Sequence, residues 1–290
     1  MNKHSTTAYE DQKGFWIRRI YFTYDYNIDE QLSTRFRLEA AGNDFKDGES
    51  KMSPFVKDAY LLWKLAGQNF YVGLSGAPTF DVVESHWGLR PVEKSPEDLW
   101  KFGSSRSFGL AMKGSFSDGL LGYHLMLGSR EGEKSDMNKG KKVFFSLTSS
   151  PIKELLLEAY MDYEHDTKDY TTHLFAGYKT ESFRMGGQFA RTRQVDALKG
   201  SYNFVSCYGA FKFMEQWQAF ARVDVLSDKG LGDQAYLRIS KSAKPTLYLA
   251  GVDYEIMKSA HVMPNIEFVK YDDSSVNSDL ITRLTFSWVF

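Results

Sequence analysis

The sequence predicts an all-β fold, an antiparallel transmembrane β-barrel that forms one domain over residues 1–290. Three observations predict it: apolar and polar residues alternate along most of the chain, the candidate strands run about ten residues, and short connections alternate with long ones. Aromatic residues make up 16% of the chain, which contains 23 glycines and 7 prolines, and this composition favours strands and turns over helices. No stretch approaches the ~20 apolar residues that a membrane-spanning helix needs.

Charge and cysteine content narrow the function classes. The formal net charge of -1 gives no reason to expect a nucleic-acid partner. The single cysteine, Cys207, excludes an internal disulfide framework and is expected to face lipid. Residues 1–7 lack the apolar run of a secretory signal.

The C-terminal strand shows the clearest alternation. Reading back from Phe290, one face carries Trp288, Phe286 and Leu284, and the interleaved face carries polar residues such as Arg283. Here the sequence resembles outer-membrane barrels, whose last strand ends in an aromatic residue that the barrel-assembly machinery reads. Phe290 is therefore the expected contact with that partner, although an antiparallel sandwich could also end in such a strand.

The same alternation recurs upstream, for example over residues 20–26, 34–40, 59–65, 155–163 and 248–256. It predicts fifteen strands that begin near residues 16, 32, 56, 69, 105, 120, 141, 154, 170, 182, 202, 217, 247, 262 and 279.

Two classes of connection separate these strands. The short class comprises residues 27–31, 66–68, 117–119, 150–153, 180–182, 214–216 and 257–260. The long class includes residues 42–54, 77–104, 131–140 and 228–244. Bacterial barrels place short turns on one rim and long loops on the other, whereas a sandwich has no reason to do so.

The parity of the strands makes a further prediction. If the last strand ends at the periplasmic rim, every short turn is periplasmic and the first visible strand runs downward. Bacterial single-chain barrels have an even strand number and periplasmic termini. We therefore expect a sixteen-stranded barrel in the full-length protein, with one N-terminal strand and a signal peptide missing from this chain. The alternative is an overlooked weak strand inside residues 231–240.

Charged residues are expected to line the lumen, because an arginine on the lipid face costs roughly 2–4 kcal/mol near the midplane. Sixteen strands leave a water-filled channel. A basic wall opposite an acidic wall would orient dipolar solutes in it; alternatively, the charges only brace the barrel wall as ion pairs. The expected basic residues are Arg19, Arg35, Arg37, Lys64, Lys113 and Arg283, and the acidic ones are Glu39, Asp58, Glu158, Asp162 and Glu164.

The long connection over residues 77–104 exceeds what a hairpin needs. Ser95 followed by Pro96 predicts a helix start, with serine at the cap and proline at the first position. Its mixture of apolar and charged residues favours a constriction loop inside the lumen, and an external lid on the rim is the alternative. The expected constriction residues are Asp81, Glu84, Arg90, Glu93 and Lys94.

The first third of the chain resembles the phosphate-selective porin O and P family. The segments that carry the resemblance are Phe15–Phe22, Leu32–Glu39, Val56–Trp63 and Phe70–Leu74, with the long loop after them. The resemblance implies a sixteen-stranded, often trimeric, outer-membrane channel. It does not extend to phosphate selectivity, which needs a dense ring of cations at the constriction. The loop contributes three cations and more acids: Arg90, Lys94 and Lys101 against Asp81, Glu84, Glu93, Glu97 and Asp98.

The predicted function is passive diffusion of small polar or ionic solutes through an outer membrane whose lipid and lipopolysaccharide surround the barrel, with anions such as phosphate among the candidate solutes. One alternative is a barrel that houses a partner protein or electron carrier. The other is a barrel-embedded hydrolase, but Ser75 lies in no nucleophile elbow and the six histidines have no metal-ligand spacing. We expect no enzyme activity, cofactor or metal.

Overall fold

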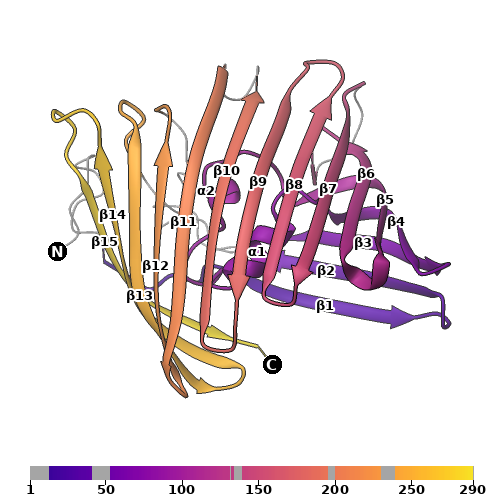
Figure 1. The fold of residues 1–290 in the computed structure, drawn as a ribbon, viewed down its shortest axis with the longest axis horizontal. Helices are drawn as coiled ribbons and strands as arrows, with labels where there is room; N and C mark the ends of the chain where they lie inside the picture. Colours follow the sequence, from indigo (N-terminus) through magenta and orange to yellow (C-terminus); the bar gives the residue numbers. More distant parts are fainter. Residues whose placement is uncertain are drawn as a thin grey trace.

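The computed structural model describes residues 13–40, 53–130, 132–133, 139–194, 200–229 and 239–289. Fifteen strands form one antiparallel sheet in which each strand pairs with the next along the chain. The sheet curves around an interior segment, residues 77–105, which is also called the loop below (Figure 1). The strands are β1 (Ile20–Asn27), β2 (Leu32–Ala40), β3 (Pro54–Leu65), β4 (Gln68–Gly76), β5 (Arg106–Phe116), β6 (Leu121–Ser129), β7 (Lys141–Ile152), β8 (Leu155–Glu164), β9 (Tyr170–Lys179), β10 (Phe183–Gln194), β11 (Gly200–Met214), β12 (Trp217–Leu226), β13 (Pro245–Met257), β14 (Ala260–Tyr271) and β15 (Asp279–Trp288). The fifteen strands that alternation predicts are confirmed.

The first strand begins at Ile20, four residues later than the prediction near residue 16. Arg18 explains the difference, because its guanidinium donates to the carbonyls of Pro91 and Val92 at 2.9 and 2.8 Å. Arg19 also points inward and pairs with Glu39. Two consecutive inward side chains break the alternation that a strand requires.

The sheet has an apolar outer face and a polar inner face. On β8, Leu157 and Met161 are exposed while the alternating Glu158 and Asp162 are buried. Leu174 on β9 is 63% exposed and Leu284 on β15 is 59% exposed. A continuous apolar surface of this extent needs lipid rather than water around it. Among the described residues, no helix has the length and apolar character to cross a bilayer.

The two edge strands run in the same direction, because β1 and β15 are separated by an even number of antiparallel steps. Within the described residues no pairing joins them. Antiparallel closure therefore requires a strand of the opposite direction between β1 and β15. Residues 231–238, which hold most of the alternative weak strand, lie outside the described residues, as does Phe290.

Backbone conformation explains the two-residue hairpin between β3 and β4. Ala66 and Gly67 have φ values of 50° and 76°, the left-handed pair that a two-residue turn of primed type needs. A Cβ on Gly67 would meet nothing within 4 Å, so the glycine is there for its conformation rather than for space.

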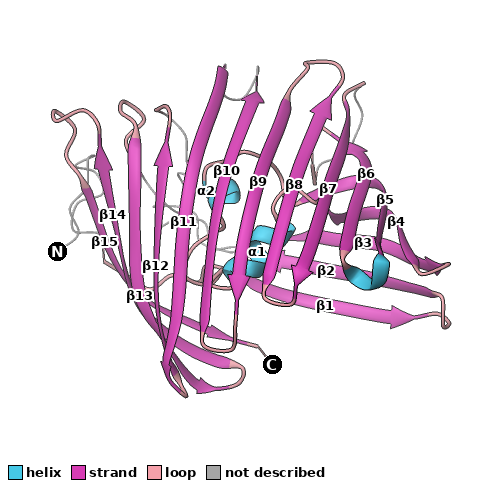
Figure 2. Cartoon of the chain, viewed as in Figure 1, coloured by secondary structure: helices cyan, strands magenta, loops and turns pink. Residues whose placement is uncertain are grey.

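The segment between β4 and β5 carries two short helices, α1 (Asp81–Trp87) and α2 (Pro96–Leu99), within the curve of the sheet (Figure 2). As predicted, Ser95 is the N-cap of α2 and Pro96 its first residue. Helix α1 was not predicted, because seven residues show too little periodicity. Its end is set by Gly88, which adopts a φ of 65°.

The interior segment packs on the inner face of the later strands. Residues from α1 and its C-terminal side form one buried cluster with side chains of β9, β11, β12, β13 and β14: Val83, Trp87, Leu89, Val92, Phe175, Tyr208, Phe220, Leu249 and Met263. A second cluster joins Leu99, Trp100 and Phe102 to Phe204 and Leu247. The segment therefore covers the inner wall from β8 to β14 and leaves the wall from β1 to β5 less covered.

Candidate functional site

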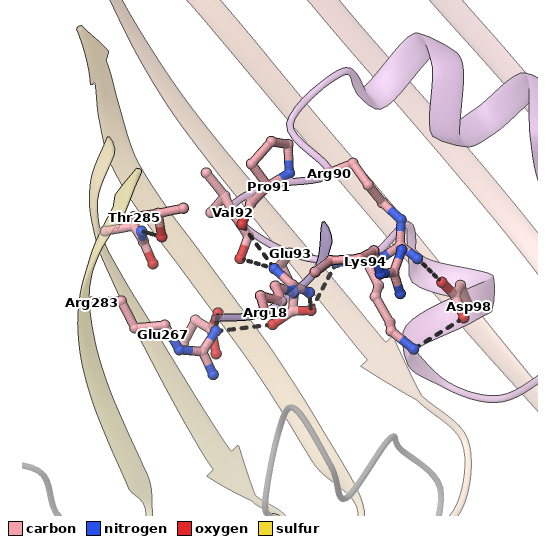
Figure 3. Close-up of polar contacts among 12 residues, drawn as sticks. Arg18, Arg90, Pro91, Val92, Glu93, Lys94, Asp98, Glu267, Arg283 and Thr285 are labelled. Atoms are coloured by element: carbon pink, nitrogen blue, oxygen red, sulfur yellow. Dashed lines mark hydrogen bonds and ion pairs between the residues drawn. The ribbon is translucent and has the colours of Figure 1, made fainter. Parts of the chain in front are cut away.

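A buried carboxylate ties the interior segment to the edge of the sheet (Figure 3). Glu93 accepts hydrogen bonds from the Arg18 guanidinium at 2.6 Å, from Arg283 at 3.1 Å and from the backbone N–H of Lys94 at 2.8 Å. Burial would raise the pKa of Glu93, but the two guanidiniums and the N–H group hold it below its ordinary value. Arg283 also reaches Glu267 on β14 at 2.5 Å. These contacts fix the loop to β14, β15 and the residues before β1.

A second anchor comes from β12. Arg222 donates to the carbonyl of Lys94 at 2.5 Å, pairs with Asp224 at 2.5 Å and lies 5.4 Å from the ring centroid of Trp87. The indole N–H of Trp100 donates to the same Asp224 at 2.8 Å. Because Arg222 and Asp224 are buried, removing either partner would leave an uncompensated charge inside the protein.

A third anchor joins α2 to β8, β9 and β10. The His173 ring lies between Glu97, at 2.8 Å from Nδ1, and Glu158, at 3.1 Å from Nε2. Gln188 donates to Glu97 at 2.7 Å, and Ser146 donates to Glu158 at 2.5 Å. Burial raises the pKa of the Glu97 carboxyl, and the nearby imidazole opposes that rise.

The other two predicted acids of β8 also have structural partners. Asp162 pairs with Lys142 at 2.8 Å and accepts the Tyr160 hydroxyl at 2.6 Å. Glu164 accepts the backbone N–H groups of residues 166 and 167. Glu158, Asp162 and Glu164 are 3%, 1% and 1% exposed. The structure thus places Glu158 and Asp162 behind the loop, where they brace the wall, whereas Glu164 accepts hydrogen bonds from the turn after β8.

The wall formed by β1, β2, β3 and β5 remains accessible and carries interleaved charges. Arg35 pairs with Asp25 at 2.6 Å, and their side chains are 31% and 57% exposed. Arg37 pairs with Asp58 at 3.3 Å, and Arg106 makes a close contact with the same carboxylate. These side chains project from neighbouring strands into the curve of the sheet.

A β-bulge enriches this wall in charge. Arg37 lies opposite Asp58 and Leu38 lies opposite Val56, so Lys57 is an extra residue on β3. As a result both Lys57 and Asp58 point inward, and Lys57 pairs with Glu39 at 3.3 Å. The acidic residues Glu39 and Asp58 therefore belong to the predominantly basic wall.

The structure brings together only part of the predicted basic group. Arg19 and Arg37 flank the ring of Tyr21, with guanidinium-to-centroid distances of 5.8 and 5.5 Å. Arg35 lies on the same wall, whereas Arg283 serves as an anchor of the loop. Lys64 lies apart from them at the short turn after β1, where its backbone N–H donates to the Gln31 carbonyl.

The loop presents an acidic edge toward this wall. Asp81, whose side chain is 58% exposed, pairs with Lys113 of β5 at 3.3 Å. Glu84 pairs with Arg90 at 2.7 Å, and Arg90 also pairs with Asp98 at 2.6 Å. Burial raises the pKa of Glu84, and the positive charges of Arg90 and Arg19 oppose that rise. Of the predicted constriction residues, Asp81, Glu84 and Arg90 lie on this edge, whereas Glu93 and Lys94 belong to the anchors.

Sequence reasoning missed Arg18 and Arg106 as parts of the site, and it counted Glu97 among the loop acids without pairing it with His173. Alternation places Arg106 in phase with outward Phe108, but it lies at the strand end and turns inward to Asp58. One signal for loop docking was present. Gly177 lies opposite Gly186, and a Cβ at Gly177 would meet the ring of His86 at 2.5 Å.

Comparison with known proteins supports the fold. OmpF of Salmonella typhi, solved with daunomycin, is similar with a TM-score of 0.67 and 16% identity, covering 93% of this chain and 89% of that one. A mutant porin of Rhodopseudomonas blastica has a TM-score of 0.61 and 15% identity, covering 94% and 89%. The trimer form of OmpT from Vibrio cholerae has a TM-score of 0.58 and 13% identity, covering 93% and 87%.

No family model matches the chain, and no curated protein matches its sequence. The resemblance to the phosphate-selective porin O and P family is accordingly not confirmed. The structural likeness, together with the apolar outer face, shows that the chain has the porin-like β-barrel fold of bacterial outer-membrane proteins.

Proposed function

We propose that this protein is a non-enzymatic outer-membrane channel for passive diffusion of small polar or ionic solutes. The observation that carries the proposal is the asymmetry of the interior. The loop covers the wall from β8 to β14, while charged side chains on β1, β2 and β5 stay accessible opposite its acidic edge. Such a surface suits hydrated solutes, and it is enclosed by a sheet whose outer face suits lipid.

The proposed path runs between the basic wall and the acidic edge. Arg19, Arg35, Arg37 and Lys113 face Asp81 and Glu84, while the buried acids of β8 contribute no exposed charge. Most of these cations have a carboxylate partner on the wall, so we propose weak ion selectivity. Anions such as phosphate would pass, without the dense cation ring that strong anion selectivity requires.

The proposal includes a closed, sixteen-stranded barrel, because an all-antiparallel sheet closes only through a strand opposite in direction to both β1 and β15. A homotrimer is part of the proposal, supported by the likeness to the trimer form of Vibrio cholerae OmpT. Contacts of Phe290 with the assembly machinery, and of the outer face with lipopolysaccharide, also belong to it.

Liposome swelling tests the proposal. Proteoliposomes containing the folded full-length protein should swell in isotonic solutions of small sugars, and the rate should fall steadily as the sugar becomes larger. Protein denatured by boiling before reconstitution is the control and should give no swelling. If folded barrels, verified by heat-dependent gel mobility, admit no sugar of any size, the channel proposal is wrong.

A further inference from the structure

The outer face of β7, β8, β9 and β10 contains cations near the ends that join the long loops. Arg191 and Arg193 share the outward side of β10 with Phe189, and both are exposed. Lys141 begins β7 on the same face, and its carbonyl accepts the backbone N–H of His165. Arg191, Arg193 and Lys141 are the outer cationic patch. They depart from the apolar outer face described above.

Strand register groups the outward residues into rows that run from strand to strand, and along β10 each row lies nearer the long loops than the one before it. One row is wholly apolar: Leu147, Ala159, Leu174, Phe189 and Val205. The next row toward the loops is mixed: Phe145, Met161, Thr172, Arg191 and Asn203. The third row contains Val143, Tyr163, Tyr170, Arg193 and Ser201, and Lys141 and His165 lie beyond it. Rows are about 7 Å apart, since each is two strand residues.

This gradient locates the edge of the hydrocarbon layer. Tyrosines concentrate where hydrocarbon meets headgroups, which is where Tyr163 and Tyr170 lie next to Arg193. An outward arginine costs roughly 2–4 kcal/mol at the midplane but about 0–1 kcal/mol near the interface. Arg191 and Arg193 therefore belong at headgroup level, about 7 Å apart along one strand.

Among the described residues, no ion pair involves Arg191 or Arg193. A planar guanidinium binds phosphate oxygens through two parallel hydrogen bonds, and tyrosine hydroxyls can donate to the same oxygens. The apolar row below the arginines provides a surface for acyl chains. Along the strands, the apolar row is followed by the arginines and the tyrosine hydroxyls. A phosphorylated lipid has the matching order, because its acyl chains are followed by its phosphorylated headgroup.

We propose that Arg191 and Arg193, with Tyr163 and Tyr170 beside them, bind the phosphorylated headgroup of an outer-leaflet lipid. The site lies on the outer face and is separate from the constriction. The inference rests on the membrane placement in the proposed function, and it does not depend on conduction.

Native mass spectrometry of the detergent-folded full-length protein, titrated with bisphosphorylated lipid A, tests the proposal. The double variant R191Q/R193Q should bind lipid A more weakly, by about fivefold for each arginine removed. The matched control is K153Q/K258Q, which removes two positive charges from the short turns after β7 and β13 and should bind lipid A as the parent does. Dephosphorylated lipid A should bind the parent and R191Q/R193Q equally.

A second arm identifies the source of the phosphate. Inorganic phosphate at millimolar concentration should not displace lipid A, because it gains nothing from the apolar row. Displacement would show a simple anion site and overturn the lipid assignment. Equal affinity of the parent and R191Q/R193Q for lipid A would also overturn it. Unchanged sugar uptake by R191Q/R193Q would show that the variant folds, so a failure of this inference is distinct from a failure of the channel proposal.

Discussion

Replacing Glu93 by glutamine removes the charge that holds the loop against β14 and β15. The substitution keeps the size of the side chain but leaves Arg18 and Arg283 facing an uncharged amide. Breaking one partner of a buried ion pair costs about 3–5 kcal/mol. If that cost falls on docking of the loop, the ratio of undocked to docked loop rises by a factor of roughly 10² to 4 × 10³.

Limited trypsin digestion of the folded barrel measures this ratio, because cleavage after Lys94 requires the loop to leave the wall. Lys94 is only 5% exposed in the docked loop. The matched control is Glu84→Gln in the same loop, whose ion pair with Arg90 is partly exposed and should contribute only about 0–1 kcal/mol. Equal cleavage rates for the two variants would refute the anchoring role of Glu93.

Three further predictions concern the same interior. The triple variant R19Q/R35Q/R37Q should shift the reversal potential in a KCl gradient toward cation preference. The shift should be larger at low salt, because the Debye length is about 8 Å at physiological ionic strength and longer in dilute buffer. No shift at any salt concentration would assign these arginines to bracing alone. Trp87→Ala removes a buried ring at the centre of the loop contacts and should weaken the packing of the loop by about 3–5 kcal/mol. We expect noisier and larger single-channel currents from a barrel that still shows heat-dependent mobility. Currents identical to those of the parent would contradict this prediction. Protection of the loop amides from hydrogen exchange, corrected for the intrinsic pH dependence of exchange, should persist from pH 7 to the ordinary glutamate pKa of 4.5 and fall at lower pH. Burial raises the pKa of Glu84 and Glu97, so these two carboxylates are protonated first and their protonation does not weaken docking. Glu93 and Asp98 have a lowered pKa, and their contribution to docking is lost only as the pH falls through those lowered values. A monotonic loss of protection beginning at pH 7 would be inconsistent with this order.

The strands could be predicted because each one repeats the same two-residue pattern between lipid and interior. On β8, for example, Leu157, Ala159 and Met161 alternate with Glu158, Tyr160 and Asp162, and both sets obey the pattern. The pattern failed at Arg18, where a side chain serves a distant loop. It could not show the bulge at Lys57 either, because the extra residue is defined only by the partner strand.

The site was less predictable, because its contacts join residues far apart in the chain. Glu158 satisfies the rule for an inward acid, yet its partners His173 and Ser146 come from other strands, and α2 covers it. Arg283 likewise satisfies the rule for an inward cation, but Glu93 is 190 residues away in sequence. Alternation tells which side a residue faces; it does not tell what lies opposite, and the position of the loop decides which charges remain accessible.

Single-channel recording of the folded full-length protein in a planar bilayer tests the central claim, that a water-filled path runs between the wall of β1 to β5 and the loop. We expect stepwise currents whose size rises in proportion to KCl concentration, with a small reversal potential in a salt gradient. Folded barrels that insert, as shown by heat-dependent mobility after recovery from the bilayer, yet give no current steps would contradict the claim.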